Sequence, residues 1–360
     1  MITSFKNKLI SSVISVVPTN EVNFMDEVGN YAFSESQHQK LGKVMGFNKR
    51  RVCKPGETIS DYAVYGIQQL LDDHVITEDE IGAIIVVTTT PDHFIPPTST
   101  IIHGHFNFSY DVACLDISQG CPGYIIGLIN AFMTLDSMKD KKVLLVTGDM
   151  LSYRVSTRDR ASRPIVGDAV SISVIENSED NNQCYCSIKN NGKSAFAVYI
   201  PAGGLRMPIT PETSIETADE FGNYRSKNHL VMNGDLVFNF IINEAPIMME
   251  ELINKANMDI KEIDYFLCHQ SSHFTLKKLA DRLGVSRDIM PNDIVSIYGN
   301  SSCASIPVTF CHYFDKLYAE KKSLKIMFAG FGIGLTWGAV ICDLPKPKYC
   351  KLVNYPHKIN

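Results

Sequence analysis

The sequence is poor in positive charge. Its 360 residues carry 34 Lys and Arg against 39 Asp and Glu, which gives a formal net charge of −5. Proteins that bind nucleic acid through its phosphates need a basic surface. The charge balance therefore argues against a general nucleic-acid binder. The chain also lacks an apolar run approaching the roughly 20 residues that cross a bilayer, so we expect no membrane span.

The N-terminal stretch lacks the pattern of a secretory signal. It begins with lysines and an apolar patch, but Ser11, Ser12 and Ser15 interrupt that patch, and no small-residue cleavage site follows. We expect a strand there. The ten cysteines have no regular framework spacing, which suits a reducing cytoplasm better than a disulfide scaffold. We therefore expect a cytoplasmic protein.

Metal-ligand spacing is also missing. "HGH" at 103–105 and "CYC" at 184–186 could each offer two ligands. Neither pair has a second pair at the spacing that zinc sites use. The sequence therefore predicts no metal site.

The sequence contains an order of elements that occurs twice. Hydrophobic residues make up 45% of a chain longer than one ordinary core, so two domains or a duplicated unit are expected. Residues 59–88 and 239–269 each predict an amphipathic helix, an acidic turn and a strand. Later strands are predicted, with helices between them, at 110–118 and 141–149 in the first half and at 292–299 and 324–332 in the second. Alternating strands and helices predict parallel sheets that are covered on both faces.

The repeat predicts two halves, residues 1–177 and 184–360, with the acidic, Asn-rich segment 176–183 between them. Ligands of such folds gather at the carboxyl ends of strands. Cys121, the loop that follows Cys268, and Asn300 would then face one cleft.

Cys121 lies in "GCPGY", directly before Pro122. If a helix starts at Pro122, proline occupies its favoured first position and Cys121 is the cap. The helix dipole would then favour the thiolate, which is the nucleophilic form. The alternative is packing, because free cysteine is often buried. His269 at a strand end and Asn300 in a Gly-Asn-Ser turn could each have a purely structural role. The three residues therefore indicate a catalytic site only when they are taken together.

Several segments, taken together, resemble the beta-ketoacyl-acyl-carrier-protein synthase III family of the thiolase-like superfamily over nearly the whole chain. They are "GCPGY" at 120–124, "DRASRPIVGDAVS" at 159–171, "CHQSS" at 268–272, "YGNSSCASIP" at 298–307 and "GFGIGLTWGAVI" at 330–341. The resemblance implies an α/β protein with a layered αβαβα fold built from two duplicated halves, and usually a homodimer.

The resemblance also implies roles for residues. Cys121 would accept an acyl group from a thioester, and His269 and Asn300 would bind the carbonyl of a malonyl-type thioester during decarboxylation. The loop of Gly332, Ile333 and Gly334 would help to hold the oxyanion. The substrates would be carried on coenzyme A or on the phosphopantetheine of an acyl carrier protein, without a further cofactor. As a dinucleotide fingerprint "GFGIG" fails, because a strand follows it where that motif needs a helix.

The chain departs from the family at the entrance to the site. In segment 39–51, Lys40 and Val44 cannot replace the Trp and Arg that hold adenine in the family. Phe274 stands where an Arg is usual, and Ile95 replaces an aromatic residue that the partner subunit supplies. Arg160 matches the family's Asp-Arg pair. Lys277 and Lys278 lie at helical spacing with Arg282 and could contact an acidic carrier protein, although a solvated helix face is the alternative.

Other activities within the superfamily stay open to different degrees. A thiolase would need a second cysteine in the closing loop, and a hydroxymethylglutaryl-CoA synthase would need a glutamate near "TTTPDH" at 88–93; neither is present. The main alternative is an acyltransferase that passes the acyl group to an alcohol or amine, in a secondary-metabolite or surface-polysaccharide pathway, without decarboxylation. A non-catalytic partner subunit is a further alternative, against which Cys121, His269 and Asn300 argue.

Overall fold

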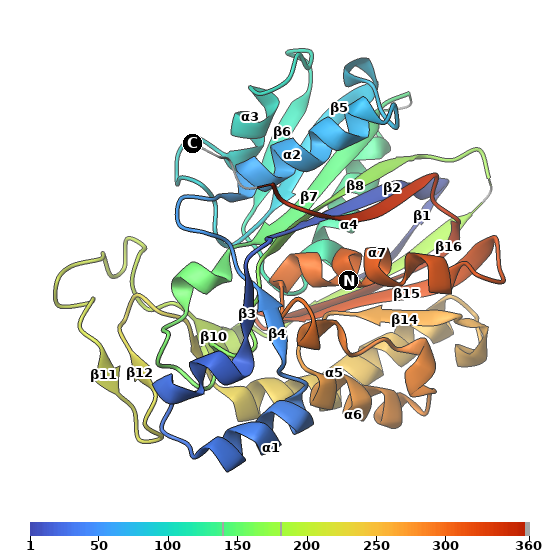
Figure 1. Cartoon of the computed structure of the whole chain (residues 1–360). Coiled ribbons are helices and arrows are strands. Elements are labelled where there is room, and N and C mark those ends of the chain that lie inside the picture. Colours follow the sequence, from blue (N-terminus) through green and yellow to red (C-terminus); the bar gives the residue numbers. More distant parts are fainter. Residues whose placement is uncertain (139, 181, 357–360) are drawn as a thin grey trace.

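The computed structural model describes residues 1–138, 140–180 and 182–356, and contains two large stacked sheets (Figure 1). The six-stranded sheet has, in spatial order, β17 (Tyr349–Asn354), β2 (Lys8–Val17), β8 (Ala169–Asn177), β7 (Lys142–Asp149), β5 (Ile81–Val87) and β6 (Ala113–Ile117). The five-stranded sheet has β1 (Ile2–Lys6), β9 (Gln183–Asn190), β16 (Thr336–Pro345), β15 (Ser323–Gly332) and β14 (Tyr265–Cys268).

Helices form three layers around these sheets, as Figure 1 shows. The middle layer consists of α4 (Gly123–Leu135) and α7 (Ser305–Leu317), while α2 (Ile59–Asp72) and α3 (Thr98–His103) cover the six-stranded sheet, and α5 (Gly234–Lys255) and α6 (His273–Leu283) cover the five-stranded one. The layered αβαβα prediction is therefore confirmed. None of the described helices is both long enough and apolar enough to cross a bilayer.

Smaller elements surround these layers. Helix α1 (Glu35–Met45) follows the short strand β3 (Glu21–Asn23), which pairs with β4 (Lys49–Arg51). The remaining short strands are β10 (Val198–Tyr199), β11 (Thr217–Ala218), β12 (Tyr224–Arg225) and β13 (Val231–Met232).

The central strands have continuous apolar sequences because both of their faces are buried. In β5, Ala83, Ile85 and Val87 pack on the middle helices, while Ile84 and Val86 pack under α2 and α3. This alternation is the two-residue period of a strand. The strand therefore contributes to two cores at once.

The prediction of parallel sheets is wrong in part, because both sheets are mixed. Strand β5 is parallel to β6 and β7, and β14 to β15, but β8, β9 and β16 run antiparallel to their neighbours. The predicted strand 292–299 is a 3₁₀ turn, η7 (Ile294–Ser296). Ile297 and Tyr298 both donate their backbone N–H to the Ile294 carbonyl, so the segment satisfies these groups locally and adds no strand beyond β14.

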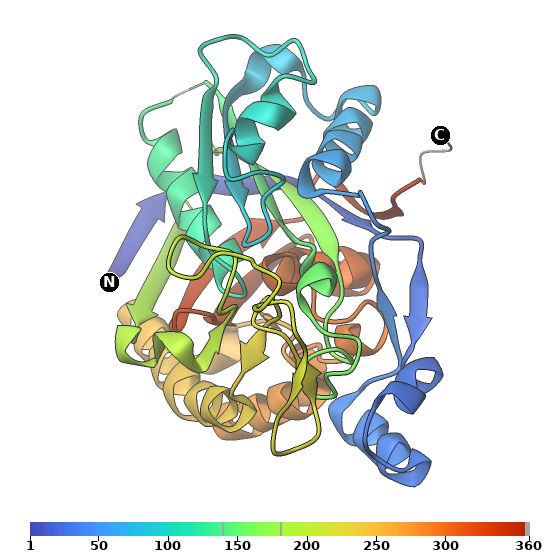
Figure 2. The ribbon, with the colours of Figure 1, turned by 90° about the vertical axis from the view of Figure 1, so that its left-hand side faces the viewer.

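The ends of the chain cross between the sheets. Strand β1 pairs with β9 of the five-stranded sheet, and β17 pairs with β2 of the six-stranded one; in Figure 2 the dark-blue β1 lies alongside the lime-green β9. Asn7, with φ of 58°, turns the chain between β1 and β2, and Asn tolerates that conformation. The chain passes between the sheets once more from Asn177 to Gln183, within the predicted linker. The exact division into halves 1–177 and 184–360 stays a prediction.

A close backbone contact holds the turn that carries Asn300. Gly167 donates its N–H to the Asn300 carbonyl (3.0 Å), and Asn300 donates its own to the Ile165 carbonyl (2.7 Å). A Cβ atom on Gly167 would lie 2.0 Å from the Tyr298 carbonyl oxygen. Only glycine fits at this point.

We predict that Gly167→Ala destabilises the protein by about 1–3 kcal/mol, because the added methyl group has to push backbone aside. Thermal or urea unfolding measures the loss. Gly192→Ala is the matched control, since a Cβ at Gly192 meets nothing within 4 Å. Equal stability of the two variants would contradict the role given to this contact.

Candidate active site

A single cavity of about 550 Å³ brings the three predicted chemical groups together. Cys121, His269 and Asn300 all line it, and so do Gly332 and Ile333. Most of the remaining wall is apolar and includes Leu151, Val198, Leu230, Phe238, Ile241 and Phe331. An apolar wall with a few polar groups is typical of sites that bind small molecules.

Cys121 lies just before α4 rather than at its cap. The helix begins at Gly123 with Pro122 as its N-cap, one residue later than predicted. The reason is a tight turn in which Gly123 N–H donates to the Gly120 carbonyl (2.6 Å), after which Ile125 N–H and Ile126 N–H bond to the Pro122 carbonyl. The cysteine therefore projects from a turn and not from the first helical residue.

Gly332 forms the opposite wall against Cys121. A Cβ atom there would lie 2.7 Å from the Cys121 Cβ and 3.1 Å from its Sγ. Gly332 also has φ of 155°, a value that disfavours other residues. Ile333 continues this turn, and its carbonyl accepts a hydrogen bond from Gln119 Nε2 (3.0 Å). Gly334, with φ of 134°, belongs to the turn but not to the cavity wall.

The prediction of a resting thiolate is wrong. Burial, followed by the charge of Asp149, raises the pKa of the Cys121 thiol to about 11. The Ser302 side chain and the backbone of Ile333 oppose that rise. Backbone hydrogen bonding at Ile333 and Cys121 favours the thiolate, but desolvation outweighs it, and the free protein holds a thiol.

His269 follows directly after β14. Its backbone N–H donates to the Ala329 carbonyl (2.8 Å), and its Nδ1 lies 2.8 Å from the hydroxyl of Ser305, the first residue of α7. Its ring meets Phe331 edge to face, with 5.9 Å between centroids. Burial lowers the pKa of His269 to about 4, so the imidazole is neutral at pH 7. Ser305 Oγ already accepts a hydrogen bond from Gln270 N–H (3.3 Å). When the Ser305 hydroxyl donates its own proton to His269 Nδ1, the ring proton sits on Nε2.

Asn300 has its amide oriented by a neighbour. Its Oδ1 accepts a hydrogen bond from Ser302 N–H (2.9 Å). Within the described part of the chain, Asn300 Nδ2 has no hydrogen-bond partner, although Asn300 lines the cavity. An amide N–H₂ held in this way can donate to a substrate oxygen.

The residues predicted at the entrance divide into two groups. Phe274 lines the cavity and stacks on Phe238, with 5.4 Å between ring centroids. Lys277 and Lys278 lie on α6 outside the lining, where Lys278 Nζ is 6.0 Å from the Phe274 centroid. Arg160 also lies outside the lining, and its guanidinium covers the Phe33 ring at 3.5 Å.

Ile95 does not reach the cavity of its own chain. Its side chain is 87% exposed, in the loop between β5 and α3. The family pattern places the equivalent side chain in the partner's site, so this exposure leaves that prediction untested.

Sequence reasoning missed three polar neighbours of the site. Ser305 orients His269, Ser302 has its Oγ 4.0 Å from Cys121 Sγ, and Asp149 is fully buried at the end of β7. Ser302 and Ser305 belong to the quoted segment 298–307, but a serine beside a candidate asparagine gives no signal of its own.

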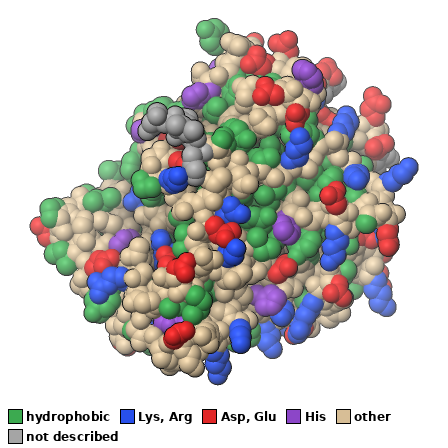
Figure 3. Space-filling view, in the orientation of Figure 1, with side chains coloured by type: hydrophobic (Ala, Val, Ile, Leu, Met, Phe, Trp, Pro, Cys, Tyr) green, Lys and Arg blue, Asp and Glu red, His purple; other side chains and the backbone are tan. Residues whose placement is uncertain are grey.

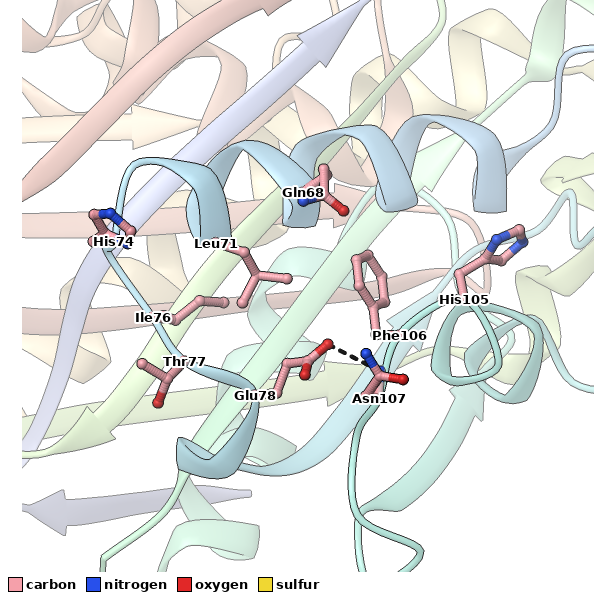
Figure 4. A pocket seen from close by; sticks show the side chains of 9 residues that line it. All are labelled: Gln68, Leu71, His74, Ile76, Thr77, Glu78, His105, Phe106 and Asn107. Carbon is pink, nitrogen blue, oxygen red and sulfur yellow. Dashed lines mark hydrogen bonds between the residues drawn. The ribbon is translucent and has the colours of Figure 1, made fainter.

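A second hollow lies away from these groups, between the end of α2 and the loop after α3 (Figure 4). His74 and His105 stand at its two ends in that view, far from each other. Glu78 is already engaged, because its Oε1 accepts a hydrogen bond from Asn107 N–H (2.9 Å). The groove offers no nucleophile, so we place the chemistry in the Cys121 cavity.

Comparisons with known proteins agree with this geometry. A family model described as 3-oxoacyl-[acyl-carrier-protein (ACP)] synthase III matches residues 115–192, and the model of its C-terminal part matches residues 253–344. A relative from Campylobacter jejuni, named putative 3-oxoacyl-[acyl-carrier-protein] synthase 3, is 30% identical over 98% of both chains. A beta-ketoacyl-[acyl-carrier-protein] synthase III from Streptococcus pneumoniae is 28% identical over 93% of this chain and 98% of its own.

A solved structure is similar over the whole length. The crystal structure of a 3-oxoacyl-(acyl-carrier protein) synthase from Burkholderia xenovorans superposes with a TM-score of 0.90 at 28% identity. The superposition covers 98% of this chain and 99% of the other. The layered fold is therefore shared in full.

The buried His269 predicts acid sensitivity. Its pKa is about 4 in the folded protein against 6.5 as the ordinary value, so only the unfolded chain takes up this proton between those values. The free energy of unfolding should therefore fall as the pH drops from 6.5 to 4, by roughly 3 kcal/mol in total. Urea unfolding across this range should show a smaller loss for His269→Gln than for the parent. The exposed His105→Gln is the control and should follow the parent curve; a parent-like curve for His269→Gln would contradict the assignment.

Proposed function

Because the chain belongs to the 3-oxoacyl-[acyl-carrier-protein] synthase III family, we propose that it condenses an acyl group with a malonyl-type thioester, with loss of carbon dioxide. The observation that carries this function is the meeting of Cys121, His269 and Asn300 on one apolar cavity. They supply a nucleophile and two hydrogen-bond donors, which are what the two half-reactions require.

In the first half-reaction Cys121 attacks the carbonyl carbon of a donor thioester. Negative charge develops on the carbonyl oxygen, and the backbone N–H groups of Cys121 and of the Gly332–Gly334 turn are its proposed donors. Support comes from their nearness to the sulfur, since the backbone of both Cys121 and Ile333 lowers the pKa of the thiol. The donor's thiol leaves, and the acyl group stays on Cys121.

In the second half-reaction a malonyl-type thioester loses carbon dioxide. Its carbonyl oxygen becomes an enolate, which His269 Nε2–H and Asn300 Nδ2–H stabilise. A neutral imidazole suits this task, because it donates a hydrogen bond without first losing a proton to the carbanion. The carbanion then attacks the acyl-Cys121 carbonyl, forming the carbon–carbon bond of a β-ketoacyl thioester and releasing the sulfur.

The substrates are carried by a phosphopantetheine arm, of coenzyme A or of an acyl carrier protein, and no other cofactor takes part. The stacked Phe238 and Phe274 give this arm an apolar passage. Lys277 and Lys278 lie on α6, the helix that carries Phe274, and Lys278 Nζ is 6.0 Å from the Phe274 centroid. Figure 3 shows Lys and Arg side chains along the lower part of this face, where α6 lies. An acidic carrier surface would complement them.

The protein works as a homodimer in the cytoplasm. Strand β6 is the edge of the six-stranded sheet, where Leu115 is 45% exposed, and Phe94 and Ile95 nearby are 86% and 87% exposed. A second copy on this edge would cover them and could bring Ile95 to the partner's cavity. All ten cysteines are free thiols, which fits a reducing compartment.

Replacing single residues should separate the two half-reactions. Cys121→Ala should take up no acyl mass from any thioester. His269→Ala and Asn300→Ala should still be acylated at Cys121 but lose decarboxylation by about 10²–10³-fold, the cost of one oxyanion donor. Peptide mass spectrometry measures the first step and release of labelled carbon dioxide the second.

The same assay tests the alternative of plain acyl transfer to an alcohol or amine. An acylated enzyme that never releases carbon dioxide from malonyl thioesters would favour that alternative. A His269 or Asn300 variant that decarboxylates normally but cannot be acylated would show that the roles are wrongly assigned.

The residues at the entrance of the cavity predict which kind of acyl donor loads Cys121 faster. Acyl groups on a carrier protein should load Cys121 faster than the same groups on coenzyme A, because Lys40 and Val44 cannot replace the family's adenine-binding Trp and Arg. Salt should shrink the advantage, since charges are screened over about 10 Å at 0.1 M. Loading kinetics of Lys278→Glu should show a roughly threefold loss with carrier-bound donors.

Lys322→Glu is the control for this preference, because Lys322 is exposed just before β15, at the opposite end of that strand from Gly332. Equal loading from both donors, with no effect of Lys278→Glu, would contradict the carrier prediction.

A further inference from the structure

Asp149 is a buried carboxylate that the proposed steps leave unused. It ends β7 with 0% exposure. Its Oδ1 accepts hydrogen bonds from Thr88 Oγ1, Thr89 N–H and Oγ1, and Thr90 Oγ1, at 2.6–3.4 Å. None of the ion pairs among the described residues includes Asp149. A charge is costly to bury without a cation. In place of a cation, hydrogen bonds from the three threonines stabilise the carboxylate of Asp149.

The second oxygen of Asp149 contacts the residue that follows Ser302. Oδ2 lies 3.6 Å from Cys303 Sγ and is not used by the threonines. Next to Cys303 stands Ser302, whose Oγ lies 4.0 Å from Cys121 Sγ. Hydrogen bonding by the Ser302 side chain also lowers the pKa of Asp149. Ser302 therefore lies between the carboxylate and the nucleophile.

The backbone of Ser302 is fixed in this position at a cost. Its φ is 51°, in the left-handed region that residues other than glycine avoid. The hydrogen bond from its N–H to Asn300 Oδ1 (2.9 Å) holds the turn. The same turn thus aims the Asn300 amide into the cavity and the Ser302 hydroxyl at the sulfur.

This arrangement bears on how Cys121 becomes a nucleophile. With a pKa of about 11, only about one thiol in 10⁴ is ionised at pH 7. The charge of Asp149 is one cause of the raised pKa. If the thiol proton moves to that same carboxylate, the opposing charge disappears and the net charge of the pair does not change. Burial raises the pKa of Asp149, which brings its proton affinity closer to that of the thiol.

We propose that Asp149, acting through the Ser302 hydroxyl, takes the proton of Cys121 as the sulfur attacks a thioester. The S–H bond breaks and its proton joins Ser302 Oγ, while the proton of Ser302 passes to the Asp149 carboxylate. The S–C bond to the acyl group forms, the donor's C–S bond breaks, and its sulfur leaves with the electron pair. That sulfur takes up one proton, and Asp149 gives one up and is again a carboxylate.

The substrate side of this proposal rests on the proposed function, but the proton path does not. Two other titratable groups adjoin the path, Cys303 and His269. Burial raises the pKa of Cys303 and lowers that of His269, so both stay neutral near pH 7. The threonines and Ser302 do not titrate in this range. A change in the pH profile therefore reports on Cys121 and Asp149.

The test is the rate at which iodoacetamide alkylates Cys121 in the folded protein from pH 6 to 10, followed by peptide mass spectrometry. In the parent the rate should level off once Asp149 has lost its proton. In Asp149→Asn and Ser302→Gly it should be roughly tenfold or more lower at pH 7, and should rise about tenfold per pH unit without a plateau. Glycine at 302 removes the hydroxyl and accepts the positive φ.

Cys303→Ala is the matched control, because it removes the other group that contacts Asp149 Oδ2 and leaves the path intact; its profile should match that of the parent. If Asp149→Asn reacts faster than the parent, the carboxylate merely suppresses the thiolate and the proposal is wrong. Parent-like rates in Asp149→Asn or Ser302→Gly also overturn it. Should Asp149→Asn fail to fold, Ser302→Gly decides. Iodoacetamide needs no thioester site, so failure of acyl loading would count against the proposed function alone.

Discussion

Burial of the side chains at and around Cys121 is the constraint on which the site depends. It keeps His269 neutral, keeps Cys121 protonated at rest and disfavours charge on Asp149. In water a thiol, an imidazole and a carboxylate would titrate independently near their ordinary pKa values. In the buried surroundings of these three groups the charged form of each is disfavoured, so a proton passes most readily from one buried group to a neighbouring one. Burial thus sets the chemistry as much as residue identity does.

Much of the fold could be predicted from the sequence because the strands carry their own signal. The continuous apolar runs of β5, β7 and β15 are typical of strands in a sheet that is buried on both faces. The direction of each strand could not be predicted, since an antiparallel β16 has the same apolar pattern as a parallel strand would have. The turn at Ile294–Ser296 has the sequence pattern of a strand, because its buried residues give the same short apolar run. Its backbone hydrogen bonds, which make it a turn, cannot be read from the sequence.

The site was predictable where residues stand at the ends of repeated elements. Cys121, His269 and Asn300 follow that rule and meet at one cavity. The charge state of Cys121 was not predictable, because the helix start is visible in the sequence whereas desolvation is a property of the assembled fold. Ser302, Ser305 and Asp149 were missed for a related reason. Each acts through a contact with an element distant in the chain, and serine and aspartate are common in loops.

The pairing of β17 with β2 has a consequence for synthesis of the protein. Tyr349 of β17 lies opposite Ser12 of β2. The six-stranded sheet therefore gains β17, one of its two edge strands, only after the long segment between these residues has been translated. β1 likewise waits for β9 before it has a partner. Contacts so distant in sequence slow folding and leave strand edges open meanwhile. The six-stranded sheet is therefore completed only after residues 349–354 have been synthesised, and one edge of β2 stays unpaired until then.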